Sequence, residues 1–203
     1  MKFHCIHFAV IIILVVLFIS CSSDDDSPSA PGPVTPSSYI IPLKVGNSWT
    51  YLAKRLLRTG AVAESAYVVI TILKDTAVQG VTWYIDNSGS WHANRNDGYW
   101  TREFSDPNHS NDFLIYKYPA GLNEVYQIAA NVTGKLASLT DTVNVPQGEH
   151  VCYRYELYQR PPYGNKLIAH EYIKPDVGLI RQHDYAPEGF LEFVFVLTSY
   201  NLN

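Results

Sequence analysis

The sequence alternates between short segments rich in β-branched and aromatic residues and short turns rich in Gly, Pro, Asn and Asp. Val, Ile, Thr and aromatic residues favour strands, whereas Gly and Pro interrupt them. Beyond residue 38, no segment has an apolar face that persists over three helical turns, and residues 53–57 come nearest. The pattern predicts an all-β domain: an antiparallel sandwich, a barrel or a strongly curved sheet of about ten short strands.

The turns and the β-rich runs between them predict the individual strands. Asn96-Asp97-Gly98 is a hairpin signal, because Gly accepts the positive φ of a tight turn. Residues 67–73 are a run of mostly β-branched residues, continuous enough to predict a strand buried on both faces. The other predicted strands cover residues 48–57, 81–85, 113–116, 124–129, 131–137, 139–145, 150–157, 166–173, 179–183 and 190–200.

The first residues predict export. Lys2 precedes an apolar run over residues 8–19, and a small residue, Ser20, then precedes Cys21. This order is typical of a signal peptide, and the run is shorter than the roughly 20 residues that span a membrane. We interpret residues 1–20 as the signal peptide and residues 21–38, with four prolines among serines, as a semi-rigid tether. Residues 39–203 then form a single β-rich domain.

Charge and cysteine content exclude several classes of function. The formal net charge is −4 and no basic patch is present, so no nucleic-acid partner is expected. Cys152 is the only cysteine of the predicted domain, so the fold has to rely on its hydrophobic core instead of a disulfide. The sequence contains no zinc-binding, nucleophile-elbow or phosphate-loop motif, so no cofactor and no enzyme class is predicted.

The end of the predicted signal peptide resembles the lipobox of bacterial lipoproteins at residues 18–21, Phe-Ile-Ser-Cys. The resemblance implies that Cys21 becomes the N-terminus and carries a diacylglyceryl thioether and an N-acyl chain such as palmitate. A multiply acylated cysteine anchors a protein stably to a membrane. Ser22 at the next position argues, in this family, against retention at the inner membrane.

The acidic run that follows bears on the location. Ser23 and the three aspartates 24–26 resemble the tag that sends some Gram-negative lipoproteins to the outer face of the outer membrane. The alternative is that the three aspartates only solvate the tether. From the likeness to this tag, we predict a protein anchored in the outer membrane and exposed at the cell surface.

The domain resembles a family of uncharacterised Gram-negative lipoproteins in residues 42–51, 148–155 and 175–180. The family carries no known activity, so the resemblance implies a location and no reaction. The curved β architecture is also similar to that of periplasmic lipoprotein carriers, which hold acyl chains in a concave sheet. That second likeness is one of fold class only, and fold does not fix function.

One cluster is the main candidate for ligand binding. The densest group of aromatic side chains comprises Trp83, Trp91, Tyr99 and Trp100, with His92, Asn94 and Arg95 among them. Flat rings beside amides and a guanidinium suit stacking on sugars or other ring-bearing ligands. Alternatively, such rings pair across a hairpin and stabilise the sheet by about 0.2–1 kcal/mol per pair.

A polar loop predicted at residues 105–112 has the spacing of a calcium loop. Oxygen-bearing side chains occupy alternate positions at Asp106, Asn108, Ser110 and Asp112. A tightly wound loop turns such side chains towards one cation. Lys117 stands where a bidentate Glu would complete the site, so a solvated surface loop is the alternative.

Two tripeptides resemble the O-glycosylation site of some Gram-negative bacteria. They are Asp75-Thr76-Ala77 and Asp141-Thr142-Val143, with Thr76 and Thr142 as the modified residues. Modification requires that each lie at an exposed turn or strand end. Otherwise both are ordinary strand residues.

These features favour a non-enzymatic binding lipoprotein whose ligand is a glycan, a lipid or a protein. The alternative is a carrier that shelters a lipid or another apolar ligand in the concave face of the sheet, which requires an apolar cavity. A hydrolase would require histidine and carboxylate groups that converge in a cleft.

Overall fold

The computed structural model describes residues 39–203 except residues 107–108 and 161–163 and the side chains of residues 105, 106 and 109. The predicted signal peptide, Cys21 and the tether lie outside the described residues. The described residues form strands and turns, which confirms the predicted all-β class. No helix among them is long and apolar enough to cross a membrane.

The described part of the chain contains twelve strands. They are β1 (Ser48–Leu56), β2 (Val62–Val78), β3 (Val81–Asp86), β4 (Trp91–Arg95), β5 (Gly98–Asp106), β6 (His109–Lys117), β7 (Val125–Ala129), β8 (Val132–Val145), β9 (Gly148–Gln159), β10 (Lys166–Lys174), β11 (Gly178–Tyr185) and β12 (Leu191–Asn201). The runs 131–137 and 139–145, predicted as two strands, are the single strand β8.

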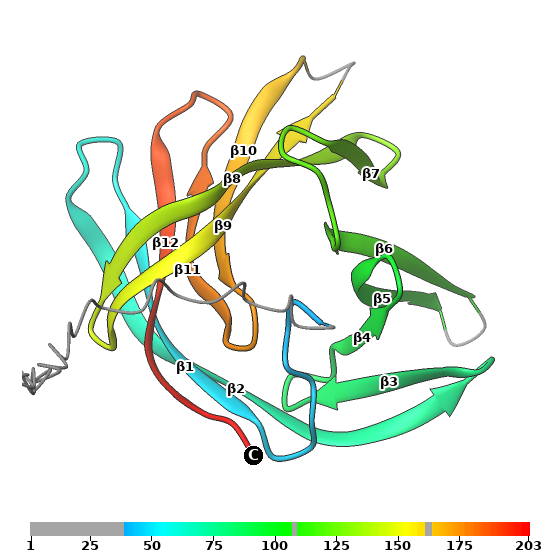
Figure 1. The fold of residues 1–203 in the computed structure, drawn as a ribbon. Helices are drawn as coiled ribbons and strands as arrows, with labels where there is room; N and C mark the ends of the chain where they lie inside the picture. Colours follow the sequence, from blue (N-terminus) through cyan, green and yellow to red (C-terminus); the bar gives the residue numbers. More distant parts are fainter. Residues whose placement is uncertain (1–38, 107–108, 161–163) are drawn as a thin grey trace, which may run out of the picture. The chain divides into compact units, whose positions relative to one another are not determined.

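All twelve strands belong to one antiparallel sheet. Its order is β6-β5-β4-β3-β2-β1-β12-β11-β10-β9-β8-β7, so the two halves of the chain are meanders that meet where β1 pairs with β12. The sheet curves into a nearly closed barrel, with its edge strands β6 and β7 close to each other (Figure 1). Of the three predicted architectures, the barrel-like curved sheet is the one observed.

Tyrosine side chains close the seam between the two sheet edges. The Tyr126 hydroxyl donates to the Ile115 carbonyl at 2.6 Å, and the Tyr155 hydroxyl donates to the Lys117 carbonyl at 2.9 Å. The Lys117 ammonium pairs with Glu124 across the same seam. A buried carbonyl without a partner is costly, so these bonds satisfy an edge that has no neighbouring strand.

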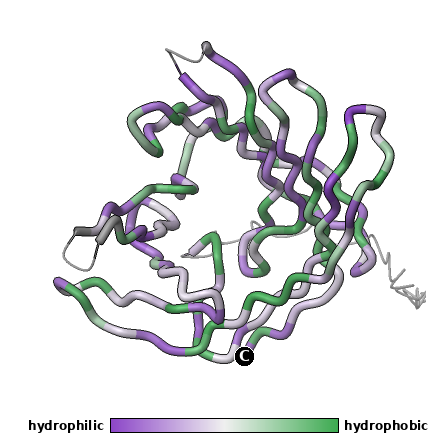
Figure 2. Tube along the Cα trace, turned by 180° about the vertical axis from the view of Figure 1, so that it is seen from behind, coloured by the Kyte–Doolittle hydropathy of each residue, from purple (hydrophilic) through white to green (hydrophobic). Residues whose placement is uncertain are grey.

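The interior is packed in two clusters of buried side chains. One contains Ile40, Ile41, Tyr116, Tyr118, Tyr126, Leu136, Tyr155 and Ile173. The other contains Trp49, Tyr51, Ile72, Val143, Cys152, Val177, Ile180 and Leu197. Apolar and polar residues are interspersed along the strands, as expected for a sheet with one buried face (Figure 2). The segment before β1 joins this core through Ile40 and Ile41.

The prediction that residues 67–73 are buried on both faces is wrong. Tyr67 is 69% exposed, Val69 48% and Leu73 58%, whereas Ile72 is 2% exposed. A strand is buried on both faces only if something covers each of them. The described strands form a single layer, so the outward side chains of β2 stay in solvent.

The seam bonds give a first prediction. Replacing Tyr155→Phe leaves the ring in place but removes the donor to the Lys117 carbonyl, and should lower the free energy of unfolding by about 1 kcal/mol in urea titration. The matched control is Tyr67→Phe at an exposed ring, which should leave the free energy unchanged. Equal effects of the two substitutions would contradict a role for the Tyr155 hydroxyl in closing the seam.

Candidate functional site

The four rings predicted to bind a ligand do not share one surface. Tyr99 and Trp100 are neighbours on β5, and successive strand residues point to opposite faces. Tyr99 stacks between His92 and Tyr116, with ring centroids 5.9 and 5.5 Å away, while Trp100 lies on the other face. Tyr99 and Trp100 therefore cannot contact one ligand from the same face of the sheet, and ligand binding by the group stays a prediction.

Trp83 belongs to an alternating stack of rings and guanidinium groups. It has no exposed surface, and the Arg102 guanidinium lies 4.3 Å from its ring centroid. Arg95 lies 5.1 Å from the Trp83 ring and 4.3 Å from the Trp100 ring. Asp112 accepts hydrogen bonds from both arginines, and those from Arg102 contribute most to lowering the pKa of Asp112. Trp83 is therefore a packing residue that holds β3, β4 and β5 together.

Trp91, Tyr99 and Trp100 are all partly exposed, and of these Trp91 and Trp100 lie on the face opposite Tyr99. Trp91 packs edge-on against Phe104 at 5.1 Å, and the Trp100 indole donates to the Asp97 carboxylate at 2.8 Å. Ligand stacking on these two rings stays a prediction.

A groove of about 730 Å³ lies where the segment 39–47 approaches the β2–β3, β4–β5 and β10–β11 turns, and we call it the end groove. Its volume falls within the roughly 300–1,000 Å³ of typical ligand sites. Its lining includes two tyrosine rings, four asparagine amides and three charged groups: Tyr39, Tyr84, Asn47, Asn94, Asn96, Asn203, Lys44, Arg95 and Asp176. This mixture suits a polar ligand better than an apolar one.

Hydrogen bonds fix the walls of the end groove. Asn47 is 2% exposed; its amide donates to the Pro42 carbonyl at 2.7 Å and accepts from the Asn203 backbone at 2.9 Å. Asn94 donates to the Ile41 carbonyl at 2.8 Å, which ties β4 to the segment before β1. The walls are therefore preorganised, which lowers the entropic cost of binding.

Two polar atoms in the lining lack partners. The Asn94 side-chain oxygen and the Arg95 Nε are buried and have no hydrogen-bond partner among the described residues. Native proteins rarely leave such groups unsatisfied. Both residues line the end groove, whereas the two unpartnered atoms themselves are inaccessible.

Sequence reasoning named Asn94 and Arg95 but missed Lys44 and Asp176. The signal that could have found them was the family resemblance, since two of its three stretches, 42–51 and 175–180, contain these residues. The two stretches meet in the structure, where the Trp49 indole donates to the Val177 carbonyl at 2.6 Å.

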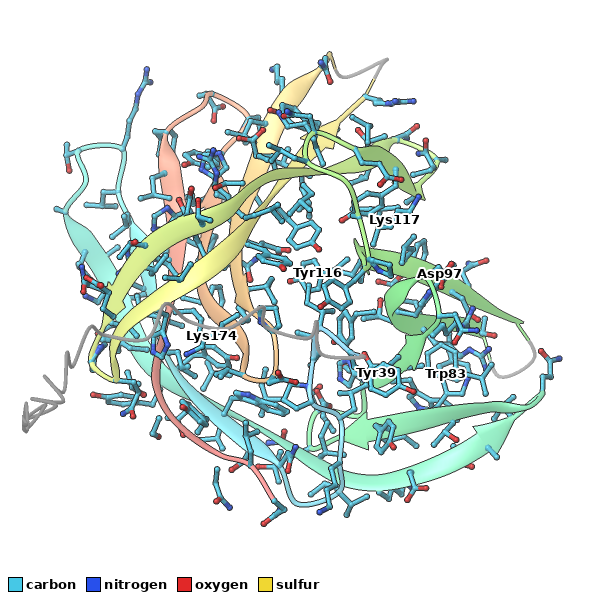
Figure 3. All side chains as sticks on the ribbon, viewed as in Figure 1. Tyr39, Trp83, Asp97, Tyr116, Lys117 and Lys174 are labelled. Carbon is cyan, nitrogen blue, oxygen red and sulfur yellow. The ribbon has the colours of Figure 1, made fainter. Side chains whose placement is uncertain are left out.

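The concave face itself holds a much smaller space. A cavity of about 120 Å³ lies among mostly apolar side chains, including Trp49, Ile70, Ile72 and Tyr99. Tyr116 lines it and points into the space that the sheet encloses (Figure 3). The cavity is well below the roughly 300 Å³ at which ligand pockets begin.

A hydrogen-bonded chain of three side chains runs along this interior. The Asp86 carboxylate lies 3.1 Å from His92 Nε2, and the Tyr99 hydroxyl lies 2.7 Å from His92 Nδ1. Burial alone would raise the pKa of Asp86, but hydrogen bonds from Ser88, His92 and Ser90 outweigh it and lower the pKa. An ionised Asp86 favours the proton on Nε2, so Nδ1 accepts from Tyr99. Both ring nitrogens are thereby occupied, and His92 acts as a structural link instead of a free base.

Glu171 is a buried carboxyl on the same concave face. It is 7% exposed, and burial raises its pKa to about 7, against a hydrogen bond with Tyr116 that lowers the pKa. Its Oε2 has no hydrogen-bond partner in the described part of the chain. At neutral pH this carboxyl is therefore close to its point of half-ionisation.

The pKa of Glu171 predicts a pH dependence of stability. The unfolded carboxyl ionises near 4.5 and the folded one near 7, so the folded state binds more protons between these values. The stability contributed by the Glu171 carboxyl is then fully present below about pH 4.5 and is lost as pH rises through about 7, by roughly 3 kcal/mol at most. Glu171→Gln should remove this decline in urea titrations between pH 5 and 8.

The matched control for that prediction is Glu188→Gln, at an exposed turn. It should leave the wild-type decline intact. A Glu171→Gln chain that loses stability with pH as steeply as the wild type would show that Glu171 does not cause the decline.

The predicted calcium loop is only partly a loop. Strand β5 ends at Asp106 and strand β6 begins at His109. Ser110 and Asp112 therefore lie within β6. Strand alternation puts Ser110 and Asp112 on one face of β6. Asn108 and the side chain of Asp106 lie outside the described residues, and Asp112 is bonded to arginines. No group of three metal-ligating side chains occurs in the described ranges, and the calcium site stays a prediction.

The two predicted glycosylation sites both lie inside ladders. Thr76 is half-buried in β2 opposite Trp83, and Thr142 is exposed in β8 opposite Val151. Exposure makes Thr142 the more accessible of the two, and modification stays a prediction for both. Cys152 is fully buried, and burial raises the pKa of its thiol to about 11, which makes it unreactive.

No family model and no curated protein matches the sequence. Two solved structures are similar in fold. One, described as an exported protein with a YmcC-like fold from Bacteroides fragilis, has a TM-score of 0.51 at 14% identity. The other, described as a lipoprotein from Parabacteroides distasonis, has a TM-score of 0.50 at 16% identity. Each match covers 81% of this chain and 99% of the other, so the described domain has a YmcC-like fold.

Proposed function

We propose that this chain is an exported, lipid-anchored binding protein that holds a polar ligand, a saccharide by its chemistry, in the end groove. The observation that carries the proposal is a preorganised groove of about 730 Å³ lined by amides, rings and charged groups. Saccharides present hydroxyls to amides and charged groups and flat faces to rings.

The location rests on the sequence and on the fold. The lipobox-like residues 18–21 support lipidation at Cys21, and the acidic residues 24–26 support export to the outer-membrane surface. Of the two proteins of similar fold, one is described as exported and the other as a lipoprotein, which agrees with this location. The domain would then hang from the membrane on the tether 21–38 and present the end groove to a ligand.

The predicted aromatic cluster has a supporting role in this proposal. Arg95 lines the end groove while its guanidinium stacks on Trp100 and Trp83. The stack restrains the rotamer freedom of Arg95 before a ligand arrives, which favours binding.

The alternative of a lipid carrier receives less support. It requires an apolar cavity that can take an acyl chain, and the cavity on the concave face measures about 120 Å³. The rest of the concave face is filled by the two packed clusters.

A glycan array with the full chain tests the proposal. A ligand found there should bind about tenfold more weakly to a Lys44→Ala, Asp176→Asn double variant, because two polar contacts of the groove are lost. Asn tolerates the positive φ of residue 176, so the turn is kept. The matched control is Lys74→Ala, at an exposed lysine of β2 that does not line the groove.

Two outcomes would contradict the proposal. Binding that survives in the double variant but is lost in a Trp91→Ala, Trp100→Ala variant would place the site on the exposed tryptophans. An array without any bound glycan would exclude a saccharide as the ligand.

A further inference from the structure

The end groove and the interior cavity are adjacent spaces that share one lining residue. Leu43 lines both spaces, and it is the only residue common to the two linings. It is half-buried and packs against both core clusters. Leu43 is therefore a common wall of the polar groove and the mostly apolar cavity, and we call it the partition.

The backbone on either side of this partition is fixed, whereas the partition itself is a flexible side chain. Ile41 is 8% exposed, and its carbonyl accepts from both the Leu43 backbone at 3.0 Å and the Asn94 amide at 2.8 Å. Asn47 holds the Pro42 carbonyl from the far side. A leucine side chain has several staggered rotamers, so it can swing without moving the backbone.

The cavity behind Leu43 has the size and lining of a site for a compact apolar group. Its volume is about 120 Å³, and its walls include Trp49, Tyr51, Ile70 and Ile72. For comparison, an engineered protein cavity of about 150 Å³ lined by apolar side chains stays dry and binds benzene. A group larger than a benzene ring, such as an acyl chain, would not fit here.

We propose that the ligand of the end groove carries an apolar substituent no larger than a benzene ring, which displaces Leu43 and enters the interior cavity. This inference rests on the proposed function and narrows its ligand to a polar head with an aryl or short branched-alkyl group. The head stays among Lys44, Asn94 and Asp176, and the substituent meets Ile70 and Ile72. Burial of the substituent adds affinity that the polar contacts alone do not supply.

Benzyl alcohol is the probe for this proposal, because its ring matches the cavity and its hydroxyl can stay in the groove. We would titrate it into the full chain in lipid nanodiscs and follow the isoleucine methyl signals by NMR. The Ile70 and Ile72 methyl signals should shift saturably, while that of Ile168, which does not line the cavity, should not. Leu43→Ala should tighten binding by roughly tenfold, because the partition no longer has to be displaced.

Ile70→Phe is the matched variant that fills the cavity, and it should abolish the saturable shift at Ile72. Wild-type and Leu43→Ala chains that show no shift would overturn the inference, as would an unchanged shift in Ile70→Phe. If the chain binds a glycan on the array but that glycan does not shift the Ile70 and Ile72 methyl signals, the inference is overturned. The proposed function is then still supported. Saturable probe binding without any bound glycan supports the cavity site and contradicts the saccharide.

Discussion

The closure of the single sheet depends on tyrosine hydroxyls that bond to the free edge of β6. Twelve strands joined as two meanders leave β6 and β7 without a second neighbour. Tyr126 and Tyr155 donate to carbonyls on β6 and thereby take the place of a missing ladder. An open edge would expose unpaired backbone groups and invite pairing with another chain. The seam therefore keeps the sheet curved, and the curvature brings the segment 39–47 against the β4–β5 turn to form the end groove.

Filling the concave face with tyrosines has two consequences. Their rings occupy most of the interior, so the space left is about 120 Å³ and a long apolar ligand is excluded. Their hydroxyls also bring polar partners inside, including His92 for Tyr99 and Glu171 for Tyr116. The proposed binding at the end of the barrel is compatible with this packing, because the end groove offers both volume and polar groups. The stack of Trp83, Arg95 and Arg102 stiffens the hairpin that carries Asn94 and Arg95 into that groove.

The sequence pattern was sufficient to predict the all-β class and most strands, because strands and turns are decided by local chemistry. Asn96-Asp97-Gly98 does form the turn between β4 and β5. The break predicted within residues 131–145 reflects irregular pairing of Leu136 and Ser138 with β9, which interrupts the register but not the strand. Burial of residues 67–73 was misjudged because an apolar run does not reveal whether a second layer exists.

The groove was harder to predict than the strands. Its lining comes from residues 39–47, the β2–β3 and β4–β5 turns, Asp176 and Asn203, which meet only after the sheet has curved. The spacing of these residues along the chain does not indicate that they come together in the folded domain. Likewise, alternation on β5 places Tyr99 and Trp100 on opposite faces of the sheet.

The most direct test of a packed interior with its ligand site at the barrel end is native mass spectrometry of the full chain released gently from its membrane. A denaturing mass of the same sample defines the covalent anchor, so any difference between the two masses is a non-covalent ligand. We expect the native and denaturing masses to be equal, or to differ by a small polar species that dissociates readily from the protein. A retained species of lipid mass would contradict the packed interior and support the hypothesis that the protein is a lipid carrier.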